Sequence, residues 1–435
     1  MKKKIISFFA FLILIAGSAQ AQTKVEQDAL KQLAIDFIND FNSGDTAQYR
    51  RFLNAHHIAA NDSKDLLRRY LNTFNAIGKV VAVAYTFPSA QMVKITAQEE
   101  KFDSWWEFTL NTTPNQVFLN RTVLPIPYPT RALQKGKLEV AAFKTTLNDY
   151  ITQKLGNNFS GNVWIMHKDK WIFKQSYGKD HKGISNSSTT LFNLASMGKM
   201  FTAISILKLR DEKKLSLDDS VGKFLPQLKN KEVSKVTISQ LLTHTSGMGD
   251  YFETPLFQQL KDKLRVSEDY LPFIEATDLS FLPGSDWRYS NTGFSLLGII
   301  IEKVSGKTYP DYLSDHIFTP AKMTATQAGN GDGGSLSTSE DLLRFATQLC
   351  NGKLLNASST KATLYNTVNH HYGYGTEHQQ LGTEHIVGHS GSLENLNTEL
   401  NIYTKSGYVV IILSNTPPPF AHHLSNKIKG LLIRN

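Results

Sequence analysis

The sequence predicts an α/β protein of two folded units, and three observations support this fold class. Helix-like apolar spacing comes first in residues 22–124 and strand-like segments follow, as in a small α+β domain. A proline-rich linker, residues 125–138, then separates this region from the rest of the chain. In residues 139–435, strand-like segments stand at both ends of a largely helical stretch. This order predicts an antiparallel sheet closed by both ends of the domain, flanked by helices and carrying a helical insertion.

The first 21 residues have the pattern of a secretory signal peptide. Basic Lys2–Lys4 precedes the apolar run Ile5–Ala16, and Ala19-Gln20-Ala21 is a small-x-small cleavage site. The alternative is a membrane anchor, but the apolar run is shorter than the roughly 20 residues that span a bilayer. We therefore expect cleavage before Gln22, no stable membrane span, and a periplasmic or secreted protein.

Net charge and cysteine content restrict the partners and the cross-links. The formal charge is +9, and loss of the three lysines of the signal leaves +6. These charges are scattered rather than gathered in a long Lys/Arg block, so we expect no nucleic-acid partner. The single cysteine, Cys350, excludes an internal disulfide and is expected to be a buried apolar residue in a helix over Leu342–Cys350. Ser337 and Glu340 fit a capping box at the start of that helix.

Residues 22–124 predict helices followed by strands. One helical face, closed by Gly44, carries Leu30, Leu33, Ala34, Phe37, Ile38 and Phe41. Asp45 can cap a second helix, and Leu66–Ile77 predicts a third. Strand-like segments follow at 79–85, 92–97, 105–110 and 117–123. In element order this region resembles the nuclear-transport-factor-2-like domains, and no catalytic set is evident in it.

Residues 139–435 begin with a predicted helix over Val140–Leu155 and a hairpin. The strands of that hairpin are expected at 161–166 and 171–177, and a final hairpin at 399–404 and 408–413. The apolar run Met200–Leu209 predicts a helix that is buried between the sheet and the helical insertion.

The first candidate catalytic residues lie in Ser196-Met197-Gly198-Lys199, at the start of this buried helix. If the helix begins at Ser196, Lys199 lies one turn later on the same face. A serine hydroxyl is a weak nucleophile until a neighbouring base takes its proton, and a lysine three residues on can hold that proton. The same spacing recurs at Ser358–Lys361, in a polar stretch that we interpret as surface.

Two further segments carry suitable side chains. A Tyr289 phenolate would be favoured beside a lysine ammonium, and Asn291 can both donate to and accept from a substrate amide. His389 can bind a carboxylate or relay a proton, and the glycine after Ser390 lets the backbone approach a ligand. An edge strand there can offer the N–H group of Ser392 to an oxyanion. Each segment alone is also compatible with an ordinary surface turn or loop.

Taken together, Ser196-x-x-Lys199, Tyr289-x-Asn291 and His389-x-Gly391 resemble the three motifs of the penicillin-recognising serine hydrolases. The branch is that of class C β-lactamases, DD-carboxypeptidases, D-aminopeptidases and esterases, and the resemblance covers about residues 140–432. It implies a β-lactamase/transpeptidase-like fold. Further agreement comes from Leu241–Gly247, Leu215–Asp219, Pro283-Gly284 and Gly334–Thr338.

The resemblance also implies roles. Ser196 would be the acylated nucleophile, with base catalysis shared by Lys199 and Tyr289. Asn291, His389 and Gly391 would contact the substrate, and the N–H groups of Ser196 and Ser392 would form the oxyanion hole. In this family His244, within Leu241–Gly247, belongs to a structural turn. Class C β-lactamases usually carry lysine where this chain has His389, so strong β-lactamase activity is not expected.

We therefore expect an exported serine hydrolase that cleaves an amide or ester through an acyl-serine. Its substrates would be cell-wall-type D-amino-acid peptides, small esters or, weakly, β-lactams, with peptidoglycan fragments among the partners. The alternative is a slowly turning-over or non-catalytic sensor of penicillin or wall fragments. No cofactor is expected and no metal, because Gly388 and the predicted strand disfavour a metal-binding helix at His385 and His389. The oligomeric state does not follow from the sequence.

Overall fold

The computed structural model describes residues 24–56, 60–113, 118–126, 128–133, 135–136, 138–368 and 371–434. The expected signal peptide, residues 1–21, and Pro127 of the expected linker lie outside this part. The chain divides into two compact units. Unit 1 comprises residues 1–101 and 105–126, and unit 2 comprises residues 102–104 and 127–435.

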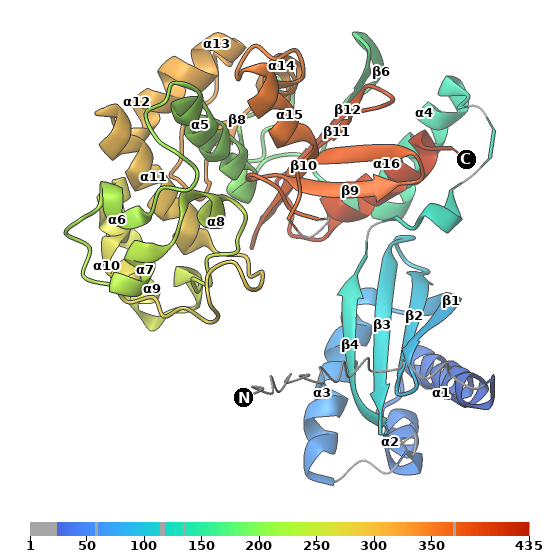
Figure 1. The fold of residues 1–435 in the computed structure, drawn as a ribbon. Coiled ribbons are helices and arrows are strands. Elements are labelled where there is room, and N and C mark those ends of the chain that lie inside the picture. Colours follow the sequence, from blue (N-terminus) through green and yellow to red (C-terminus); the bar gives the residue numbers. More distant parts are fainter. Residues whose placement is uncertain are drawn as a thin grey trace, which may run out of the picture. The chain divides into compact units, whose positions relative to one another are not determined.

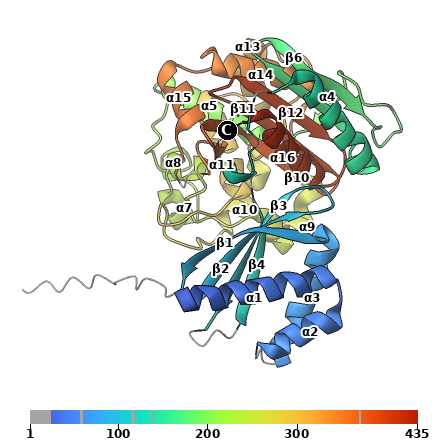
Figure 2. The ribbon, with the colours of Figure 1, turned by 90° about the vertical axis from the view of Figure 1, so that its right-hand side faces the viewer.

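Unit 1 is an α+β structure in which three helices precede a four-stranded antiparallel sheet of order β1-β2-β3-β4 (Figure 1). Figure 2 shows α1 running across this sheet, and the six predicted apolar residues of α1 are all buried. Asp45 caps α2 as predicted, since the Ala47 N–H donates to its carboxylate at 2.8 Å. The elements are α1 (Lys24–Ser43), α2 (Thr46–Ala55), α3 (Ala60–Ile77), β1 (Val80–Ser89), β2 (Met92–Glu99), β3 (Trp105–Thr112) and β4 (Phe118–Pro125).

Unit 2 is built on a six-stranded antiparallel sheet of order β6-β5-β12-β11-β10-β9. Two neighbouring inner strands of this sheet come from opposite ends of the unit, because β5 pairs with β12 and places Trp164 opposite Ile411. The sheet closed by both ends of the domain is therefore confirmed. Its strands are β5 (Gly161–His167), β6 (Lys170–Tyr177), β9 (Glu377–Leu381), β10 (Glu384–Leu393), β11 (Leu396–Tyr403) and β12 (Tyr408–Ser414), and a separate pair is formed by β7 (Phe192–Asn193) and β8 (Leu336–Ser337).

Helices cover both faces of this sheet. Alternate residues of β12 point to opposite faces, so Val410 and Ile412 pack with α4 (Val140–Asp149) and α16 (Phe420–Leu432). Ile411 and Leu413 instead join the core around α5 (Lys199–Asp211). Ten of the 13 residues of α5 are buried, which confirms the expected burial of this helix. The remaining helices are α6 (Val221–Phe224), α7 (Lys231–Lys235), α8 (Ile238–Leu242), α9 (Pro255–Leu260), α10 (Leu271–Glu275), α11 (Asn291–Ser305), α12 (Tyr309–Leu313), α13 (Thr319–Ala321), α14 (Ser339–Cys350) and α15 (Ala357–Tyr365).

Three details differ from the predictions. The helix expected over residues 140–155 is α-helical only to Asp149 and ends in a π-helical turn, Tyr150–Leu155. Thr338, not Ser337, caps α14, because Ser337 belongs to β8 and its hydroxyl bonds the Thr326 hydroxyl at 2.8 Å. Cys350 is exposed rather than buried, since it is the last residue of α14, beyond the buried stripe that ends at Leu349.

The second Ser-x-x-Lys sequence lies on α15, where Ser358 and Lys361 are both exposed, as predicted. Within the described part of the chain, every helix is too short or too polar to cross a bilayer.

The cap of α14 is directly testable by substitution. Thr338 Oγ1 accepts from the Asp341 N–H at 3.2 Å, so Thr338→Ala should lower the free energy of unfolding by about 1 kcal/mol. Thr338→Ser keeps the accepting hydroxyl and should stay close to wild type. Urea unfolding followed by circular dichroism measures both variants, and equal stability of the alanine and serine variants would show that the cap contributes nothing.

Candidate active site

The helix was expected to begin at Ser196, but Ser196 lies in a tight turn just before α5. Residues 195–198 form a 3-10 turn in which the Met197 N–H donates to the Leu194 carbonyl at 3.1 Å, and α5 begins at Lys199. Ala195 has a φ of 46°, in the left-handed region that a residue with a Cβ rarely adopts. The turn is close-packed, because a Cβ on Gly198 would lie 3.0 Å from the Cα of Gly333.

Lys199 connects the turn to two other segments. Its ammonium donates to Ser196 Oγ at 3.2 Å, to Asn291 Oδ1 at 2.5 Å and to the Asp332 carbonyl at 2.5 Å. All three hydrogens of the ammonium therefore have acceptors. The side chain is fully buried, and this burial lowers the pKa of Lys199 to about 8, although nearby Asp332 and Asp250 oppose the shift. A substantial fraction of Lys199 is thus neutral in mildly alkaline solution.

Tyr289 lies beside this lysine, with the Lys199 Nζ 5.0 Å from the centroid of its ring. Its hydroxyl is buried, and no hydrogen-bond partner for it exists among the described residues. Burial raises the pKa of Tyr289 well above its ordinary value of 10, and the neighbouring Ser196 hydroxyl offsets only part of the rise. The phenol therefore stays protonated at neutral pH, which disfavours a phenolate base.

Asn291 is held in one orientation at the first turn of α11. Ser290 caps this helix by accepting the Gly293 N–H at 3.1 Å. The Asn291 Nδ2 donates to Asp250 Oδ2 at 2.6 Å, which turns its carbonyl oxygen towards Lys199. Asp250 thus positions the amide.

β10 passes directly over the turn that carries Ser196. A Cβ on Gly391 would lie 2.1 Å from the Leu194 carbonyl oxygen, so only glycine permits this approach. β10 is not an edge strand along its whole length, because β9 pairs with it from Glu384 to Gly388. Among the described residues no strand continues this pairing from His389 onward, so the expected edge is local.

Ser196, Asn291 and Ser392 line a single cavity of about 490 Å³. Aromatic and apolar side chains and the glycine-rich loop before β8 form the rest of its wall: Ala195, Tyr251, Phe252, Phe257, Lys261, Leu264, Tyr270, Asn330, Asp332, Gly333, Gly334 and Leu393. The structure thus brings together residues that are almost 200 positions apart in the sequence. The volume of this cavity suits a small molecule or a short peptide.

Comparison with known proteins identifies the family of the chain. The sequence model of the family described as Beta-lactamase matches residues 147–433. The chain belongs to this family of serine hydrolases. It is 29% identical to Penicillin-binding protein 4* of Bacillus subtilis over 60% of this chain and 68% of that protein. It is 26% identical to Protein flp of Staphylococcus aureus strain MW2, over 65% of each chain.

A solved penicillin binding protein from Bacillus halodurans matches 68% of this chain and all of that one, with a TM-score of 0.58 and 26% identity. These matches confirm the predicted family and the predicted fold of unit 2. The sequence alignments span about two thirds of the length of the two named relatives.

His389 is placed differently from the other predicted substrate contacts. Its ring is buried and does not line the cavity with Ser196. Its Nδ1 donates to the Ser390 carbonyl at 2.6 Å, and its Nε2 therefore accepts from the Tyr372 hydroxyl at 3.0 Å. Burial lowers the pKa of His389, although Glu377 opposes the shift, so the ring is neutral at pH 7.

The sequence did not indicate roles for Asp250 and Asp332, and it placed His244 only in a structural turn. His244 Nδ1 accepts from the Ser290 N–H at 3.1 Å, and its ring lies 4.2 Å from that of Tyr289, so it positions the Tyr289–Asn291 segment. Burial holds the pKa of His244 well below 6.5. The signal for Asp332 was its place among the glycines of residues 329–334, which indicates close backbone packing.

The described residues contain no group of three or more His, Cys, Asp and Glu side chains that could hold a metal ion.

The close approach of β10 to the turn that carries Ser196 predicts that one added methyl group will lower activity. Gly391→Ala should lower kcat by about 100-fold or more, because the clash with the Leu194 carbonyl displaces both the turn and the strand. Gly249→Ala is a matched control, since its Cβ would meet no atom within 4 Å. Steady-state hydrolysis of an ester substrate checks this, and equal rates for both variants would remove the argument.

Proposed function

We propose that the protein is an exported hydrolase that cleaves an amide or ester through an acyl-Ser196 intermediate. The observation that carries this proposal is the 3.2 Å hydrogen bond between Lys199 Nζ and Ser196 Oγ beside a cavity that Asn291 and Ser392 also line. Export rests on the signal-peptide pattern of residues 1–21.

In this mechanism neutral Lys199 takes the proton of Ser196 as Oγ bonds to the substrate carbonyl carbon. Its pKa of about 8 suits a base near neutral pH, whereas the raised pKa of Tyr289 makes its phenolate costly. The proton then passes to the leaving nitrogen or oxygen, and Tyr289, as a neutral phenol near Ser196, can relay it. Water attacks the acyl-enzyme in the reverse sequence and releases Ser196.

The remaining predicted residues receive roles that follow from their positions. The N–H groups of Ser196 and Ser392 would stabilise the oxyanion, each worth roughly 3–4 kcal/mol. Gly391 lets β10 approach the turn closely enough for this. Asn291 would hold the substrate amide and orient Lys199. His389 would support Tyr289 and not contact the substrate directly, since the centroids of the two rings lie 6.5 Å apart.

For the substrate we propose cell-wall-type D-amino-acid peptides or small esters. Support comes from relatives named as penicillin-binding proteins. β-Lactams would be poor substrates, because a buried neutral His389 attracts a carboxylate less than a lysine would. Unit 1 is proposed to be a nuclear-transport-factor-2-like domain that contributes to specificity, and deletion of residues 22–128 without any change in kinetics or stability would argue against this.

Covalent labelling tests the nucleophile. A fluorophosphonate or labelled penicillin should add one mass increment to Ser196, and Ser196→Ala should abolish the adduct and lower kcat/KM by about 1,000-fold or more. Ser358→Ala, in the exposed second motif, is the matched control and should label normally. An adduct on a different residue in active protein contradicts the proposal. Stoichiometric acylation without product release would identify a sensor instead.

The pH dependence of kcat/KM tests the base. If neutral Lys199 is required, kcat/KM should rise with pH and reach half its maximum near pH 8, the lowered pKa of this lysine. Lys199→Arg stays charged and should be inactive across the range. A Tyr289 phenolate that depends on a charged Lys199 would give the opposite sign, a rate that falls above pH 8.

A further inference from the structure

The cavity that contains Ser196 also holds a buried carboxylate that is only half bonded. Asp332 lines this cavity and is 6% exposed. The Tyr251 hydroxyl donates to Asp332 Oδ2 at 2.6 Å. The other oxygen, Oδ1, is buried and has no hydrogen-bond partner among the described residues. No ion pair with Asp332 is formed within this part of the chain, because Lys199 donates to the Asp332 backbone carbonyl instead.

A buried carboxylate with an unused acceptor is energetically costly, because it has lost water without gaining a full set of donors. Burial accordingly raises the pKa of Asp332. Tyr251 cannot supply the missing donor, since its only hydroxyl hydrogen is already directed at Oδ2. A bound group that brings its own N–H hydrogens and positive charge would remove this cost.

The surroundings of Asp332 suit an organic ammonium. Asn330 uses its amide nitrogen to donate to the Tyr270 hydroxyl, which leaves its carbonyl oxygen as a second acceptor at the cavity. The rings of Tyr251 and Phe252 stack with centroids 4.4 Å apart, and both line the cavity. Aromatic faces attract cations, so they favour an ammonium or an apolar group attached to it.

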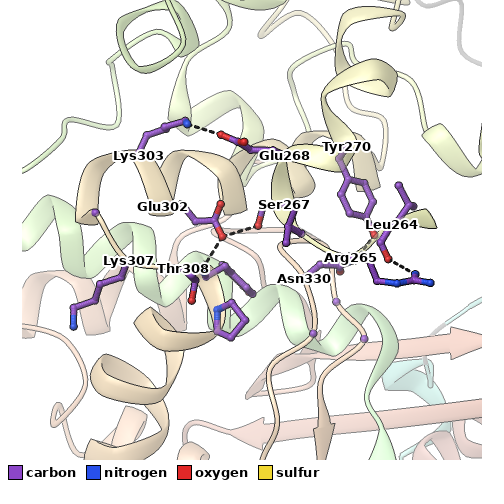
Figure 3. A pocket seen from close by; sticks show the side chains of 17 residues that line it. Leu264, Arg265, Ser267, Glu268, Tyr270, Glu302, Lys303, Lys307, Thr308 and Asn330 are labelled. Atoms are coloured by element: carbon purple, nitrogen blue, oxygen red, sulfur yellow. Dashed lines mark hydrogen bonds and ion pairs between the residues drawn. The ribbon is translucent and has the colours of Figure 1, made fainter. Parts of the chain in front are cut away.

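A second cavity of about 890 Å³ shares the lining residues Tyr270 and Asn330 with the cavity of Ser196 (Figure 3). The bonding of its carboxylates differs from that of Asp332. Its two acidic side chains, Glu302 and Glu268, each have one bonded oxygen, and neither has a buried oxygen that lacks a partner among the described residues. Glu302 accepts from the Ser267 hydroxyl at 3.0 Å and the Tyr309 N–H at 2.7 Å, and Glu268 pairs with Lys303 at 2.5 Å. The unsatisfied carboxylate therefore belongs to the cavity of Ser196.

We propose that Asp332 binds the free ammonium group of a substrate whose scissile carbonyl lies at Ser196. The preferred substrates are then aminoacyl amides or esters with an unblocked amine, rather than N-acylated peptides or penicillins. This assignment deepens the proposed function and rests on it. Lys199 supports the placement, because its ammonium bonds both Ser196 and the Asp332 backbone and so holds the two residues beside each other.

A matched substrate pair tests the proposal: an aminoacyl p-nitroanilide, in both enantiomers, and its N-acetyl derivative. The wild type should hydrolyse the free amine faster. Asp332→Asn keeps the shape of the side chain but removes the charge, and kcat/KM should fall about 10- to 100-fold further for the free amine than for the N-acetyl substrate, mainly through KM. Because the lost charge also lies near Lys199 and acts on both substrates alike, the ratio of the two kcat/KM values is the readout. Asp262→Asn, an exposed carboxylate outside the cavity lining, should change neither rate.

The outcomes are distinguishable. Equal losses on both substrates, with acyl-enzyme accumulating, would show that Asp332 serves the deacylating water and would overturn the proposal. An unchanged preference in Asp332→Asn, or a wild type that prefers the N-acetyl substrate, would also overturn it, and the wild-type comparison holds even if the variant does not fold. Fluorophosphonate labelling of Ser196 in each protein reports separately on the proposed function. If the wild type is not labelled at Ser196, the proposed nucleophile is wrong, whatever the substrate preference.

Discussion

The burial of one ammonium group is the constraint on which the active site depends. Lys199 lies with no exposed surface in the first turn of α5, and its pKa falls from 10.5 to about 8. This difference corresponds to about 3 kcal/mol of destabilisation of the charged form. The fold tolerates it because Ser196, Asn291 and Asp332 supply three acceptors from three separate segments. The same burial that makes the charged lysine costly would let neutral Lys199 serve as the base of the proposed mechanism.

The surroundings of Lys199 balance charge without adding another cation. His244 and His389 are both buried and neutral, and the hydrogen bonds of their Nδ1 atoms fix the ring orientations. Asp250 and Asp332 are the nearest acids, and their negative charge limits the fall of the lysine pKa. Both also act as scaffolding, since Asp250 orients Asn291 and Asp332 accepts from Lys199 through its backbone. The acids therefore set both the geometry and the basicity of the site.

Much of this site follows from the sequence, because Ser196, Lys199, Tyr289 and Asn291 occur in short motifs with chemically meaningful spacing. The closed sheet was also predictable, since apolar strands stand at both ends of the domain. What the sequence did not reveal depends on tertiary contacts. The left-handed Ala195, the burial of His389 and the contacts of Asp250 and Asp332 arise only when loops distant in the chain pack against the turn that carries Ser196. The wrong prediction of the α14 cap had a local cause, because Ser337 is part of β8 and Thr338 is therefore the N-cap residue.

The protonation of Lys199 is the central claim, and it can be observed without any substrate. Lysine labelled with ¹³C at Cε and ¹⁵N at Nζ allows each ammonium to be titrated by NMR, and the spectrum of Lys199→Arg assigns the resonance. The account predicts one lysine with a midpoint near pH 8 that is missing from that variant. If the Lys199 resonance instead titrates near pH 10.5, the ordinary value for a lysine side chain, the buried base does not exist and the account is wrong.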